Sequence, residues 1–436
     1  MALSENGLSL LRDHLGEDRR YLQDILDTLN GEDRSVETED VEIACEQLET
    51  LCAGMESLAE IYRDDQGQSL DETLRETINR AWETGKVLIE DQEDTVALES
   101  VDGVVTMESI VSQAKRLWEL MVQAVQRLWN IIKGFFDGVS GDISRIKLRC
   151  KQVRHRAQNA SGRSVKQMDT ELGREINGLI TFHRYPRNGK DIIDGLREYD
   201  RQLTVMLGSY TTHLKKMGDN LKLRLSSVDM NAADKALEGI NATVGDFDLL
   251  SEASKAGTLY EVHDARWGGS DVKRLPYLMG RKSVFFIYPR KRNDSGTTLA
   301  VAESLRNRRA LIALSSAETY EAHVEGMIKT IPAGNVIDIC DEVIQICDRV
   351  LEYQPNMKML ETLQEDMRKA TKGLSSAIEN NSSIDSPTFA RVRAMINYNT
   401  SFARWATQPQ VALCSNALTS CRSGLIASGK SMQNYG

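Results

Sequence analysis

One short run of residues matches the pattern of a phosphate-binding loop. Residues 424–431 read Gly-Leu-Ile-Ala-Ser-Gly-Lys-Ser and satisfy GxxxxGK[ST], in which backbone N–H groups cradle phosphates while the Lys and Ser side chains reach the terminal phosphate and magnesium. A working loop follows a buried strand and opens a helix. The residues before Gly424 have a helical pattern, and no apolar strand ending in Asp lies at a suitable distance. We therefore expect no ATPase.

Other residue types that carry out chemistry are present without the spacing that chemistry needs. The six histidines are scattered, with no HExxH and no GxSxG pattern. Six of the seven cysteines form three pairs with a spacing of seven residues, which on a helix separates the thiols by ~10.5 Å along the axis, too far for a disulfide. These pairs are Cys45 with Cys52, Cys340 with Cys347, and Cys414 with Cys421. We expect small core residues in a reducing compartment, no metal, no cofactor and no enzymatic activity.

A candidate proteolytic processing site lies where the charge of the chain changes sign. Residues 1–100 contain 27 acidic and 8 basic side chains, a net charge of −19, whereas the remainder contains 37 acidic and 46 basic side chains, a net charge of +9. The small-x-acidic tripeptide that starts at Ala97 and ends at Glu99 sits at this junction, directly before Ser100. The pattern suggests a removable acidic leader. The alternative is a solvated acidic domain that is never removed.

Apolar periodicity predicts a mainly α fold, a long-helix bundle with a small β insertion around residues 257–315. The strand signals are residues 259–263, 283–288 and 310–314, and Pro355 and Pro387 mark expected helix breaks. We expect four regions: residues 1–99 as an acidic helical propeptide, 100–256 as a helical body, 257–316 as the β-containing insertion, and 317–436 as C-terminal helices that complete the bundle.

Residues 107–136 form the most amphipathic segment of the chain. A Trp-rich apolar face with basic flanks suits insertion into a membrane surface, although most helices of this kind pack on other helices. The side chains of this possible membrane or partner face are Leu117, Trp118, Met121, Leu128, Trp129 and Phe135.

A dense basic stretch follows in residues 141–190. Contact with a phosphate backbone would be non-specific and steeply dependent on salt; the alternative is a solvated face paired with nearby carboxylates. The possible phosphate contacts are Arg145, Lys147, Arg149, Lys151, Arg154 and Arg156.

Three parts of the chain carry a resemblance to a known family. The junction at residues 96–110, the insertion at residues 278–287 and 310–314, and the closing segments at residues 332–351 and 392–435 resemble internal head proteins of large contractile-tailed bacteriophages. The resemblance implies packaging into the prohead as a precursor and a cut by a phage maturation protease after a small-x-Glu tripeptide. Residues 44–46, 81–83 and 316–318 also fit that tripeptide, but only Glu99 lies at the charge step.

The predicted function is therefore a non-enzymatic virion structural protein, made in the host cytoplasm and located in the capsid interior. Its expected partners are capsid or scaffold proteins, the maturation protease and, non-specifically, packaged DNA. The alternative is a membrane-active helical protein that is released from an acidic pro-segment, with a membrane as the less favoured partner.

Overall fold

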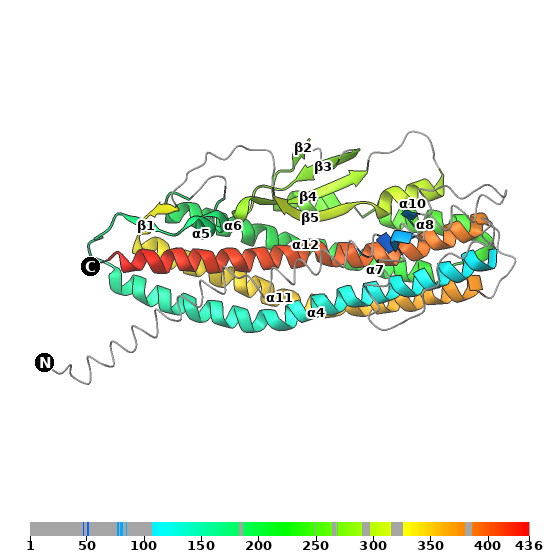
Figure 1. Ribbon diagram of the computed structural model, residues 1–436, viewed down its shortest axis with the longest axis horizontal. Helices are drawn as coiled ribbons and strands as arrows, with labels where there is room; N and C mark the ends of the chain where they lie inside the picture. Colours follow the sequence, from blue (N-terminus) through cyan, green and yellow to red (C-terminus); the bar gives the residue numbers. More distant parts are fainter. Residues whose placement is uncertain are drawn as a thin grey trace.

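Three long helices run side by side along the length of the molecule (Figure 1). They are α4 (Met107–Ala160), α11 (Ala333–Glu379) and α12 (Ser386–Gln433). The computed structural model describes residues 47, 50, 51, 76, 77, 79–81, 84, 107–182, 186–247, 249–263, 267, 269–289, 297–314, 326–379 and 386–435. With α4 spanning ~80 Å at 1.5 Å per residue, the protein is an elongated bundle.

Three consecutive helical segments pack against α11 and α12. They are α6 (Gly189–Leu203), a π-helical turn η1 (Thr204–Tyr210) and α7 (Thr211–Ser226). The first of them begins at Asn188, whose side-chain oxygen accepts hydrogen bonds from the backbone N–H groups of Lys190 and Asp191 at 3.0 and 3.3 Å, as expected of a helix N-cap. The shorter helices are α5 (Arg174–Leu179), α8 (Ala233–Gly245), α9 (Leu249–Ala253) and α10 (Thr298–Arg306), with 3-10 turns η2 (Met230–Ala232), η3 (Ser254–Ala256) and η5 (Met279–Arg281).

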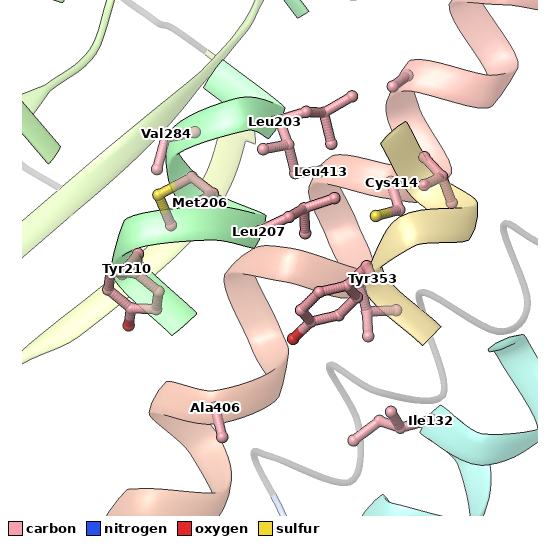
Figure 2. Close-up of a cluster of buried hydrophobic side chains, with 14 of the residues drawn as sticks. Ile132, Leu203, Met206, Leu207, Tyr210, Val284, Tyr353, Ala406, Leu413 and Cys414 are labelled. Carbon is pink, nitrogen blue, oxygen red and sulfur yellow. The ribbon is translucent and has the colours of Figure 1, made fainter. Parts of the chain in front are cut away.

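Helix α12 is the central element of the bundle. It contacts α4, α6, α8, α11 and strand β5 (Arg309–Leu314), and every residue from 392 to 406 is buried. Its buried polar groups find partners: Tyr398 Oη donates to Asn241 Oδ1 at 2.7 Å, and Gln364 Nε2 donates to Asn399 Oδ1 at 2.5 Å. Figure 2 shows part of the core, where side chains of α6, η1, α11 and β4 surround this helix.

The β insertion predicted from the sequence is confirmed. It is an antiparallel sheet in the order β2 (Tyr260–Val262), β3 (Ser270–Arg274), β4 (Lys282–Pro289) and β5. Strand β4 is buried on both faces, since alternate side chains point to opposite sides of a strand. Val284 and Phe286 belong to the main core, whereas Phe285 and Ile287 pack in a second cluster with Trp267. The mainly α fold class with this insertion is likewise confirmed.

Two features differ from the expectations. Helix α4 continues past residue 136 to Ala160, because the buried stripe runs on through Val139, Ile143 and Cys150. The break expected at Pro355 is wrong, since Pro355 lies inside α11. Its lost N–H hydrogen bond is a cost of about 3 kcal/mol, which is offset by the burial of apolar side chains on both sides of it.

Candidate functional site

The phosphate-loop pattern at residues 424–431 lies within the last turns of α12. Its backbone is helical, so its N–H groups serve the helix rather than a phosphate. Added methyl groups at the two glycines would meet Ile192 Cγ2 at 3.4 Å and Arg149 Nη2 at 3.7 Å, which shows that both face packed neighbours. Lys430 Nζ donates to the Leu172 carbonyl at 3.5 Å, and burial lowers its pKa.

The hydroxyl at the end of this pattern has a structural role. Ser431 is fully buried, and its Oγ lies 3.2 Å from Thr170 Oγ1, which lies 3.0 Å from Thr330 Oγ1. Asn434 Nδ2 donates to both threonine hydroxyls, at 2.9 and 3.0 Å. Thr170 belongs to β1 (Asp169–Glu171), which pairs with β6 (Met327–Lys329). This cluster ties the two-stranded sheet to the end of α12.

At least three of the six predicted phosphate contacts on α4 are paired within the chain. Arg154 makes two hydrogen bonds to Asp341, at 2.7 and 3.3 Å, and Lys147 bonds Asp348 at 2.5 Å. Arg145 pairs with Asp142 one turn earlier in α4. These contacts leave less cationic charge free than the sequence suggests. The other three differ in exposure: Lys151 is exposed, whereas Arg149 and Arg156 are half-buried.

The carboxylate partners on α11 were missed in the sequence. Asp341 and Asp348 are seven residues apart and therefore lie on one face of α11, as Lys147 and Arg154 do on α4. The sequence does contain a signal for this contact, because a pair of basic residues on one helix and a pair of acidic residues on another have the same spacing of seven. The sequence could not show that the two helices are neighbours.

The amphipathic face of α4 packs inside the bundle where the structure describes its side chains. Leu128 and Phe135 are fully buried, and Trp129 is 5% exposed. Phe136 contacts Tyr353 of α11, with ring centroids 5.2 Å apart, a distance typical of aromatic packing. The side chains of Leu117, Trp118 and Met121 lie outside the described part of the chain.

Buried cysteines join the same helices. Cys150 of α4 and Cys340 of α11 are in reciprocal contact, each Sγ lying 3.6 Å from the backbone oxygen of the other. Burial raises the pKa of Cys347 to about 12 and also raises the pKa values of Cys414 and Cys421. The thiolate is the reactive form, so Cys347, Cys414 and Cys421 are core groups of low reactivity.

We expect the thiols of Cys150, Cys340, Cys347, Cys414 and Cys421 to resist iodoacetamide at pH 8 in the native protein and to react fully in denaturant. Peptide mass spectrometry measures the labelling in both states. Rapid labelling of the native protein would contradict this burial.

The raised pKa of Cys347 also makes stability depend on pH. Because the Cys347 thiol ionises near pH 9 in the unfolded chain but near 12 when folded, its contribution to the free energy of unfolding is complete below pH 9 and is lost as the pH rises toward 12.

The acidic leader makes at least two core contacts with the body. Leu51 and Ala81 are both fully buried and belong to the same hydrophobic core cluster as the long helices. The residues of the expected processing site, Ala97, Glu99 and Ser100, lie outside the described residues.

The described part of the chain offers two further observations on possible sites. No helix in it is long and apolar enough to traverse a lipid bilayer. Its His, Cys, Asp and Glu side chains form no group of three or more that could hold a metal ion.

Comparison with known proteins identifies the family. Neither a curated protein nor a solved structure matches the chain. The family model of the phiKZ-like phage internal head proteins matches residues 23–427, a range that covers most of the leader, most of the long helices and the β insertion. The chain therefore belongs to the phiKZ-like phage internal head proteins, structural components of the virion interior.

Proposed function

We propose that this protein is a non-enzymatic structural component of the phage head that is packaged with the genome as a precursor and cut between Glu99 and Ser100. The observation that carries the proposal is the change in net charge, from −19 in residues 1–100 to +9 in the remainder, at a small-x-Glu tripeptide. Membership of an internal head family supports the location.

The charge step gives cleavage a physical purpose. An acidic leader repels DNA and attracts basic capsid or scaffold surfaces, whereas a cationic body tolerates close contact with phosphates. Removing the leader thus reverses the sign of the protein. Because Leu51 and Ala81 also bury apolar surface in the core, release of the cut leader has to overcome packing as well as charge.

Burial argues against a competing tripeptide. Residues 81–83 fit the small-x-Glu pattern, but Ala81 is fully buried. A protease binds its substrate as an accessible chain segment, so cleavage after Glu83 would require local unfolding of the core around Ala81. We infer that this site is protected in the folded precursor.

The proposed organisation has four parts: residues 1–99 as the propeptide, 100–256 as the helical body, 257–316 as the β insertion, and 317–436 as the C-terminal helices. Proposed partners are capsid or scaffold proteins, the maturation protease and packaged DNA, bound without sequence preference. No cofactor is invoked.

Mass spectrometry of mature particles tests the cut. The first peptide of the protein is expected to begin at Ser100, and peptides from residues 1–99 are expected to be depleted at least tenfold relative to proheads. An intact 436-residue chain in mature particles would end the proposal.

A pair of matched variants tests the choice of site. Glu99→Gln removes the acidic side chain of the tripeptide and is expected to leave the precursor uncut in particles, whereas Glu83→Gln, the same change at the protected tripeptide, leaves processing unchanged. Equal processing of both variants would place the cut elsewhere.

The membrane-active alternative finds no support in the described side chains, since Leu128, Trp129 and Phe135 are core residues. The ATPase alternative is disfavoured because residues 424–431 are helical and packed.

A further inference from the structure

One end of the bundle carries exposed cationic side chains that form no ion pair with the carboxylates of the described residues. We call it the basic end: Lys151, Arg163, Lys166, Arg174, Arg187 and Lys190, all of them exposed. Within the described ranges, none of the six takes part in an ion pair, in contrast to Lys147 and Arg154, which flank Lys151 on α4. Unpaired surface cations are available to an external anion.

Long-range backbone contacts bring these residues to the same end. Lys166 N donates to the Asn434 carbonyl at 2.8 Å, so the segment after α4 lies against the end of α12. Lys329 N donates to the Arg187 carbonyl at 3.0 Å, so the segment before α6 lies beside β6 and therefore beside its partner β1. Figure 1 shows the end of α4, β1, α5 and the C-terminus gathered at this end.

The local charge balance is strongly positive. Residues 151–190 contain 9 basic and 3 acidic side chains, and residues 143–168 contain no carboxylate side chain at all. Of the three acidic groups, Asp169 is already paired with Lys329 at 2.7 Å. The sequence alone directed attention to residues 145–156, where at least three of the cations are paired with carboxylates of the chain.

The centre of the basic end is a projecting but well-anchored segment. Every residue from 161 to 168 is exposed. Its backbone is held by hydrogen bonds from Arg163 N to the Ala160 carbonyl at 3.0 Å and from Thr330 N to the Met168 carbonyl at 2.8 Å. Val165 also forms a β-bridge with Tyr435. An anchored backbone lowers the entropy cost of presenting Arg163 and Lys166 to a partner.

The arrangement fits a polymeric anion better than a small one. The cations come from four separate segments, namely the end of α4, residues 161–168, the start of α5 and residues 187–190, and all of them are exposed. Lys and Arg side chains distributed in this way contact successive phosphates without reading bases.

We propose that the basic end binds the phosphate backbone of double-stranded DNA without sequence preference. This inference rests on the proposed packaging of the protein with the genome, and it assigns the DNA contact to residues other than the paired cations of α4.

The test measures binding of the purified full-length chain to two unrelated 30-bp duplexes by fluorescence anisotropy between 50 and 200 mM salt. The basic-end variant combines Arg163→Gln, Lys166→Gln, Arg187→Gln and Lys190→Gln. The control variant combines Lys133→Gln, Lys235→Gln, Lys358→Gln and Lys372→Gln, exposed lysines that lie elsewhere on the described surface. Both variants lower the net charge by four, so only the position of the charge differs.

For the unmodified chain we expect equal affinity for both duplexes and a steep decrease in affinity with salt. The basic-end variant should lose at least about tenfold in affinity at 50 mM salt, and the slope of log K against log salt should shrink by about 1 for each phosphate contact removed. The control variant should change affinity by less than about twofold.

Equal losses in the two variants, or no binding of the unmodified chain at 50 mM salt both before and after removal of residues 1–99, would overturn the proposal. The basic-end variant could instead keep its DNA affinity but unfold at a lower temperature. That result would mean that these cations stabilise the fold by pairing with carboxylates of the acidic leader, and it would also overturn the proposal. Processing at Glu99 is read separately in particles, so failure here is distinguishable from failure of the proposed function.

Discussion

Replacing Arg422 by Met is expected to lower the free energy of unfolding by about 3 kcal/mol, because it leaves a buried carboxylate without its inner partner. The side chain of Asp142 in α4 is only 6% exposed, and it is paired with Arg422 of α12 and with Arg145. The Arg145 side chain is 77% exposed, so it contacts the Asp142 carboxylate from the solvent side and does not replace the inner partner Arg422. The Asp142–Arg422 pair therefore joins the first helix after the proposed cut to the central helix.

Urea unfolding followed by circular dichroism measures this effect as a lower midpoint with an unchanged slope. The double variant Asp142→Leu with Arg422→Met is expected to recover most of the loss, since it removes both charges together. Lys147→Met is the control, because Lys147 and Asp348 form an exposed pair at 31% and 55% side-chain exposure worth at most about 1 kcal/mol. Equal losses for Arg422→Met and Lys147→Met would show that the inner pair contributes little.

Gly218→Ala is expected to destabilise the protein by about 2 kcal/mol through overpacking. A methyl group at Gly218 in α7 would lie 2.6 Å from Leu363 Cδ2 of α11 and 2.7 Å from Phe402 Cε2 of α12. All three helices meet at this glycine, so relief requires two packed side chains to move. An aromatic ring inside a dense core has little room to do so.

Gly141→Ala in α4 is the matched control. Nothing lies within 4 Å of its added methyl group, so the same substitution should stabilise the helix by about 0.5–1 kcal/mol. The two variants are compared by thermal unfolding. A change of the same sign in both would mean that the contact at Gly218 does not limit how closely α7 approaches its neighbours.

The long helices were predictable because their apolar spacing is strong over many turns. The C-terminal helices expected within residues 317–436 are α11 and α12. The strands that carry apolar runs were predictable for a similar reason. Strand β3 was missed because Val272 is its only apolar side chain, and β1 and β6 were missed because each has only three residues. Such short strands are defined by their pairing, which links residues far apart in the chain.

Some features of the candidate sites were likewise predictable from the sequence, and others were not. The charge step at Glu99, the helical setting of Gly424 and the core role of the cysteines followed from residue types and spacing. The division of the basic stretch into paired and unpaired cations did not, because the partners Asp341 and Asp348 are separated from Arg154 and Lys147 by 187 and 201 residues.

The amino-acid sequence by itself determined the helical class, the place of the β insertion and the separation of negative from positive charge, since these depend on composition and short-range periodicity. Only the tertiary structure decided which helix lies at the centre, that Pro355 remains helical, and which cations stay free at the basic end. These outcomes depend on contacts between distant segments, whose free energies of burial and charge pairing exceed the local preferences of any one residue.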